Sequence, residues 1–162
     1  MSTRKLTGLA MFLAVGIVLS YLEYLVPLNL SVPGMKLGLA NMVTMFVLYR
    51  YNEKDSFIVL FLRVLISGFL FSGLSTILFG IAGGFLCILI MWITKKTGFF
   101  SVTGVSISGA VFHNIGQLIV AFIIMGNNSI MYYLPYLLIS GLISGLMIGY
   151  ASSFLIKRFQ NI

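Results

Sequence analysis

The sequence has few charged residues, and acids are the scarcest among them. Of 162 residues, ten are Lys or Arg and three are Asp or Glu, whereas 60% are hydrophobic and the mean hydropathy is +1.11. So small a polar fraction cannot cover the surface of a soluble globule. The composition predicts an all-α integral membrane protein whose residues 1–162 form a single transmembrane domain.

The chain is equally poor in the residues that most catalytic and metal sites require. It has one cysteine and one histidine, so an internal disulfide and a cysteine metal cluster are excluded. Its three acids include no aspartate-rich cluster of the kind that holds Mg²⁺ in prenyl-diphosphate synthesis, and no phosphate-binding Gly-x-x-x-x-Gly-Lys-Ser/Thr loop occurs. Nothing provides a metal site or a nucleophilic triad. We therefore expect no enzymatic activity and no cofactor.

What the sequence does contain is a series of long apolar runs separated by short polar gaps. A helix needs about 20 residues to cross the hydrocarbon layer and satisfies its backbone hydrogen bonds internally. This template predicts six transmembrane helices, of which the second and third are short. The expected ranges are Leu6–Val26, Lys36–Tyr49, Ser56–Phe71, Ser75–Thr94, Val102–Met125 and Tyr132–Ile156.

Eight of the ten basic residues occur as pairs at the ends of these runs. Lys and Arg concentrate in short cytoplasmic segments, so the pairs predict cytoplasmic N- and C-termini, with only Lys36 on the outside. The first outer connection, Pro27–Met35, is the longest and can cover a site that opens outward. No basic face interleaved with aromatic residues exists for a nucleic acid. The four pairs are Arg4 and Lys5, Arg50 and Lys54, Lys95 and Lys96, and Lys157 and Arg158.

Polar residues within the apolar runs are the candidate functional groups, because they are costly in a membrane unless they are paired or face a cavity. His113 and Gln117 share one helix face, and Asn114 is offset by one position. An imidazole and two amides can donate and accept hydrogen bonds to the head group of a small ligand. Alternatively, they hold neighbouring helices together.

Three charged residues lie in or beside the same helices. Arg63 either extends to the inner interface along its apolar stem or faces the bundle and pairs with an anion. Glu23 lies near the outer end of the first helix, and we expect a depth difference of more than about 10 Å from Arg63 at 1.5 Å per residue. Glu23 and Lys36 flank the first outer loop, where they can pair with each other or bind opposite ends of a ligand.

Small residues repeat at four-residue intervals in two helices. Gly141, Gly145 and Gly149 form a face on which another helix of the bundle is expected to pack closely. Ala10 and Ala14 form a similar pair in the first helix, which by itself is ordinary for a membrane helix.

Several segments together resemble the Gx transporter family, which is also catalogued as heptaprenyl diphosphate synthase component I. The Lys-Leu-Gly-Leu-Ala-Asn and His-Asn-x-x-Gln segments are its most specific elements, and the likeness covers almost the whole chain. The segments that carry it are Leu19–Glu23, Pro33–Asn41, Leu62–Leu65, Ala82–Gly84, Gly109–Gln117 and Tyr132–Pro135. The family is similar to the substrate-binding (S) components of energy-coupling factor transporters, which are compact six-helix membrane proteins.

This resemblance implies a multi-pass protein of the prokaryotic plasma membrane that captures a small molecule, lipophilic or anionic, from outside. Uptake would be driven by the ATPase and transmembrane coupling subunits of a separate module. In S components an Ala-xxx-Ala pair docks on the coupling subunit, and Ala10 and Ala14 match it. The substrate contacts would be Glu23, Lys36, Asn41, Arg63, His113, Asn114 and Gln117.

Two alternatives stay open at this point. One is a non-catalytic accessory subunit of isoprenoid synthesis that associates with a soluble prenyltransferase. The other is a scaffold in a membrane redox complex, whose polar residues serve only to pack the helices.

Overall fold

The computed structural model describes residues 2–25 and 38–160, which form helices and, within this part of the chain, no strand. They form six α-helices, of which α2 is the shortest, and two irregular helical turns. A π-helical turn, η1, continues the third helix, and a 3₁₀ turn, η2, precedes the last. The elements are α1 (Thr3–Leu25), α2 (Leu39–Arg50), α3 (Glu53–Ser67), η1 (Gly68–Ser72), α4 (Leu74–Thr97), α5 (Val102–Met125), η2 (Asn128–Tyr133) and α6 (Leu134–Gln160).

Five spans in this fold are long and apolar enough to cross a membrane. They are α1, α3 with η1, α4, α5 and η2 with α6. The sixth expected crossing corresponds to α2, whose 12 residues extend for only about 18 Å at 1.5 Å per residue. That length is well short of the ~30 Å hydrocarbon layer. The part of the chain that the structure describes thus has five candidate spans and a shorter apolar helix.

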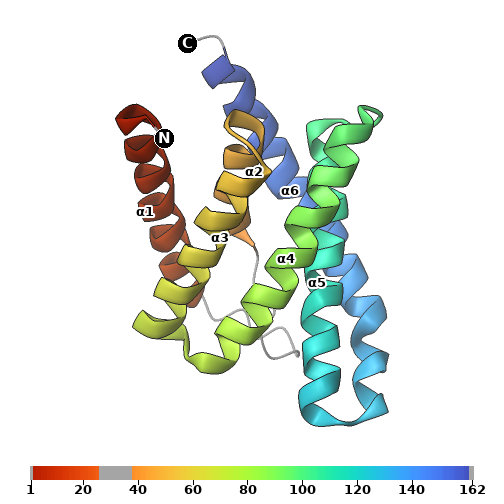
Figure 1. Ribbon diagram of the computed structural model, residues 1–162. Coiled ribbons are helices and arrows are strands. Elements are labelled where there is room, and N and C mark those ends of the chain that lie inside the picture. The colour runs from red at the N-terminus through yellow and green to blue at the C-terminus, as the bar shows by residue number, and fades with distance from the viewer. Residues whose placement is uncertain (1, 26–37, 161–162) are drawn as a thin grey trace.

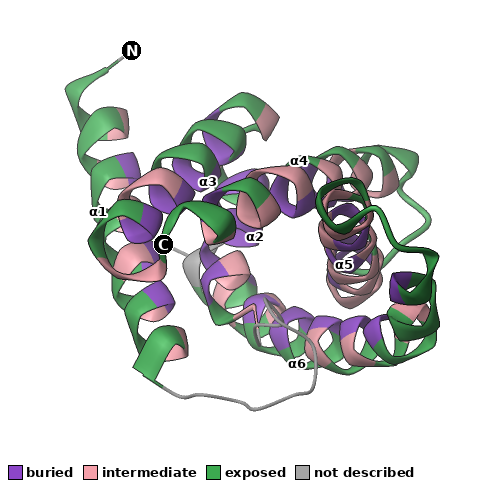
Figure 2. Ribbon diagram, turned by 90° about the horizontal axis from the view of Figure 1, so that it is seen from below, coloured by how far each residue is buried: buried purple, intermediate pink, exposed green. Residues whose placement is uncertain are grey.

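The short helix α2 lies in the centre of the bundle (Figure 2). It contacts α1, α3, α4 and α6, and every residue from Val43 to Leu48 is buried. A helix that is apolar on all sides is expected in such a fully enclosed position. The helix α1 lies at the periphery, where it packs on α2, α3 and η1 (Figures 1 and 2).

The four basic pairs lie at one end of the bundle. The start of α1, the α2–α3 turn, the α4–α5 connection and the end of α6 are together at the top of Figure 1. At this end, Lys5 forms a 2.5 Å ion pair with Asp55. Lys95 donates a 2.6 Å hydrogen bond to the carbonyl of Leu48, in the last turn of α2. The predicted segregation of basic residues to one end is therefore present.

The glycine face of α6 packs on α5, as the four-residue repeat predicts. A Cβ atom added to Gly145 would lie 2.6 Å from Cα of Ile107, and one added to Gly149 would lie 2.8 Å from Cα of Thr103. Such contacts leave no room for a side chain between the two helices. The α5–α6 pair consequently forms a closely packed unit along one wall of the bundle.

Candidate ligand-binding site

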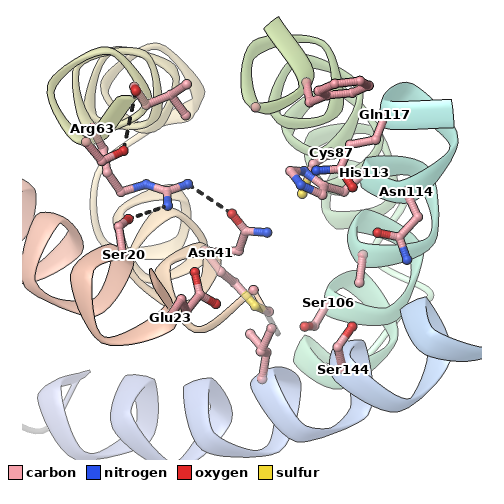
Figure 3. Close-up of a pocket in the computed structure, with 18 of the residues that line it drawn as sticks. Ser20, Glu23, Asn41, Arg63, Cys87, Ser106, His113, Asn114, Gln117 and Ser144 are labelled. Atoms are coloured by element: carbon pink, nitrogen blue, oxygen red, sulfur yellow. Dashed lines mark hydrogen bonds between the residues drawn. The ribbon is translucent and has the colours of Figure 1, made fainter. Parts of the chain in front are cut away.

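A cavity lies between the helices, and all six of the α-helices contribute residues to it (Figure 3). Its volume is about 70 Å³. That is room for several water molecules, because one water occupies at least ~10–15 Å³ by this measure. Six of the seven predicted substrate contacts line the cavity: Glu23, Asn41, Arg63, His113, Asn114 and Gln117.

Arg63 lies in the bundle and does not extend to the inner interface. Only 7% of the residue is exposed, and its Nη1 donates to Ser20 Oγ at 3.1 Å while Nη2 donates to Asn41 Oδ1 at 3.0 Å. The absence of a side chain at Gly16 makes room for it, because a Cβ there would lie 2.9 Å from Arg63 Cδ. The alternative in which Arg63 extends along its stem to the membrane interface is therefore wrong.

Glu23 lies on the same wall of the cavity as Arg63. The backbone N–H of Leu39, the first residue of α2, donates to the Glu23 carboxylate. The carboxylate is also close enough to interact electrostatically with the Arg63 guanidinium. The long side chain of Arg63 reaches Ser20, which lies three residues, or nearly one turn, before Glu23 on α1.

The opposite wall is formed by α5, which presents His113, Asn114 and Gln117 (Figure 3). Asn114 is buried, and its amide donates a 2.8 Å hydrogen bond to the carbonyl of Leu137 on α6. Asn114 therefore joins α5 to α6, which is one of the two roles that the sequence allowed for it. The backbone of α4 approaches α5 closely at Gly83, where a Cβ would lie 2.8 Å from the His113 carbonyl oxygen.

The remaining predicted residues lie elsewhere. Lys36 is outside the described residues, as is the loop Pro27–Met35. Ala10 and Ala14 are exposed on α1 and take no part in the cavity. Their exposure leaves this side of α1 without a neighbour among the described helices, so the face is open to lipid or to a partner.

The sequence did not single out several residues of the cavity. Ser20 is the most important, because it fixes Arg63, and its spacing of three from Glu23 placed both on one helix face. Ser106 and Ser144 bring hydroxyls from α5 and α6, and Met45 and Met91 make part of the wall apolar. These residue types are common in any membrane helix, so nothing in the sequence distinguished them.

The charges of the cavity are few and nearly balanced. Among its described residues, one guanidinium and one carboxylate face a lining of amides, hydroxyls, an imidazole and apolar groups. Within residues 2–25 and 38–160, no three His, Cys, Asp or Glu side chains come together to hold a metal ion. The arrangement is suited to binding a small polar or amphipathic molecule by hydrogen bonds and one charged contact.

A model of a protein family, described as heptaprenyl diphosphate synthase component I, matches residues 12–155 of the chain. No curated protein and no solved structure matches the chain significantly.

Proposed function

The chain belongs to the heptaprenyl diphosphate synthase component I family, and we propose that it is a membrane-embedded substrate-binding component of a transporter of the energy-coupling factor type. It would capture a small molecule from outside and deliver it to a separate ATP-driven module. Its N- and C-termini would lie in the cytoplasm, with the basic pairs on that side. The protein itself would carry out no catalysis.

The observation that carries this proposal is the polar cavity. Buried polar and charged groups are expensive within a membrane-spanning bundle, and they commonly mark a substrate pathway or binding site. In this protein, polar side chains from all six α-helices line one cavity. They do not serve only as hydrogen-bonding pairs between two neighbouring helices. A scaffold that needs only packed helices would have no use for such a space.

The exposed side of α1 provides a docking face for the coupling subunit. Ala10 and Ala14 lie four residues apart on a helix that has few neighbours. Small residues at this spacing allow two helices to approach closely. Docking there would leave the cavity accessible, because neither alanine lines it.

The test is purification of the tagged protein from its own membranes, followed by identification of the subunits that accompany it. We expect ATPase and coupling subunits with the wild type and with Ala151→Leu, a control substitution at an exposed alanine of α6. Ala14→Leu is expected to lose them while retaining its helical content. Equal recovery of the module with all three proteins would contradict docking at α1.

A second candidate is a non-catalytic membrane subunit of isoprenoid synthesis, and the description of the family favours it. It predicts that a soluble prenyltransferase accompanies the protein and that no ATPase does. The same purification therefore distinguishes the two functions.

A further inference from the structure

The buried guanidinium of Arg63 keeps a donor for which the described protein provides no acceptor. Its Nε–H is buried and makes no hydrogen bond, although Nη1 and Nη2 are bonded to Ser20 and Asn41. A buried donor without a partner costs about 1–3 kcal/mol. Such groups are rare in native proteins and call for an explanation, of which a missing ligand is one.

The two hydrogen-bond partners of Arg63 are uncharged, so no direct contact within residues 2–25 and 38–160 neutralises its positive charge. Glu23 is the only acid that lines the cavity among the described residues, and its carboxylate accepts the N–H of Leu39 at the start of α2. The partial positive charge at that helix N-terminus stabilises the carboxylate locally. Arg63 is thus left with unused hydrogen-bonding capacity that an anion would satisfy.

The number of charges limits how negative this anion can be. The described lining holds one guanidinium, and the field of Glu23 already opposes part of its charge. A ligand with two or three negative charges would leave at least one charge buried and uncompensated, which costs several kcal/mol. A monoanion adds the smallest negative charge beside Glu23, whose own charge is partly stabilised at the N-terminus of α2, and it therefore incurs the least of that cost. The planar edge of a guanidinium that carries Nε–H and Nη2–H matches the two oxygens of a carboxylate.

We infer that the cavity recognises its ligand through a single carboxylate bound to Arg63, an assignment that rests on the proposed capture role. The rest of the ligand extends toward α5, where His113 and Gln117 offer polar contacts (Figure 3). Met45 and Met91 add apolar surface to the lining of the cavity. The substrate class is accordingly a small organic monocarboxylate with both polar and apolar parts. The charges of the described lining favour such a carboxylate over phosphate esters and diphosphates.

The experiment compares four small probes, each of which has four carbon atoms and a different head group. Butyrate, butanol, butylamine and butyl phosphate are each titrated against the intact protein in lipid nanodiscs, and binding is followed as the rise in the thermal unfolding midpoint. We expect butyrate to stabilise the wild type at concentrations at which the other three do not. Arg63→Gln is expected to weaken butyrate binding at least tenfold, and Arg63→Lys to restore part of it.

Two further variants keep the test informative if Arg63→Gln fails to fold. Gln117→Glu adds a carboxylate to the cavity without changing its shape, and should weaken butyrate binding while strengthening that of butylamine. Phe154→Leu, at an exposed position of α6 away from the cavity, should leave the binding of butyrate and of butylamine unchanged. Stabilisation by butanol, butylamine or butyl phosphate equal to that by butyrate would overturn the assignment, as would no stabilisation by any probe.

This result is separate from the test of the proposed function. Recovery of the ATPase module with the protein, together with a preference for an uncharged, cationic or phosphorylated probe, would refute the carboxylate assignment and leave the transport role standing. A preference for butyrate without any ATPase partner would retain the carboxylate site and refute the transport role.

Discussion

Replacing Gly145 with Ala tests whether the closely packed α5–α6 pair determines the stability of the bundle. A Cβ at this position would lie 2.6 Å from Cα and 3.2 Å from the backbone nitrogen of Ile107, and 3.1 Å from Cβ of Ala110. Ordinary carbon contacts begin at about 3.5 Å. Because the nearest atoms belong to the backbone, the helices must separate by roughly 1 Å to reach that distance.

The expected cost follows from two opposing effects. Overpacking a closely packed site costs about 1–3 kcal/mol. Alanine gains up to ~1 kcal/mol over glycine in helix propensity. The net effect is a loss of roughly 0–2 kcal/mol in the free energy of unfolding, and the 2.6 Å contact with backbone favours the upper part of this range. The assay is unfolding in mixed micelles with increasing denaturing detergent, followed by circular dichroism.

Gly104→Ala is the matched control, because it makes the same substitution near the start of α5. The nearest atom there is Cδ1 of Phe100 at 3.3 Å, and Phe100 is a half-exposed side chain that can move. Its free energy of unfolding should stay the same or rise slightly. If Gly145→Ala were as stable as Gly104→Ala, close α5–α6 packing would not be what holds this wall together.

Two further predictions separate the functions of neighbouring residues on α5. Asn114→Ala removes the buried hydrogen bond to Leu137 and should lower the free energy of unfolding by about 0.5–2 kcal/mol in the same detergent titration; an unchanged value would show that this bond is not stabilising. His113→Ala should leave the bundle folded but weaken binding of the small molecule that the proposed capture role requires, as measured by equilibrium dialysis of that molecule. Unchanged affinity in a folded variant would remove His113 from the site.

The helices themselves were largely predictable from hydropathy. The range Val102–Met125 agrees with α5 at both ends, because Ser101 caps its first turn and Gly126 ends it with a positive φ of 59°. The third helix extends further than expected at both ends. Asn52 caps its start by accepting from the N–H of Asp55, and the π-helical turn continues it to Ser72.

The orientation of side chains inside the bundle was harder to predict from the sequence. Lipid tails are as apolar as the interior of the bundle, so hydropathy does not reveal which face of a membrane helix points inward. Small residues carry part of this information. Close packing of Gly141, Gly145 and Gly149 against another helix was predicted correctly, and the structure shows that this helix is α5. For Arg63 no such pattern existed, and its two possible orientations were distinguished only by the contacts with Ser20 and Asn41.

The central position of α2 could not be predicted from the sequence either. Its length and composition predicted a short transmembrane helix, and nothing in them indicated that four other helices surround it. This position matters for the site, because it brings Asn41 within hydrogen-bonding distance of Arg63.

The most direct test of the capture role is native mass spectrometry of the protein released gently from its own membranes. One spectrum reports both the small molecules that stay bound and the subunits that accompany the chain. The proposed function predicts a complex with ATPase and coupling subunits and a small ligand that dissociates from this chain. A complex with a soluble prenyltransferase, without ATPase subunits and without a small ligand, would contradict it.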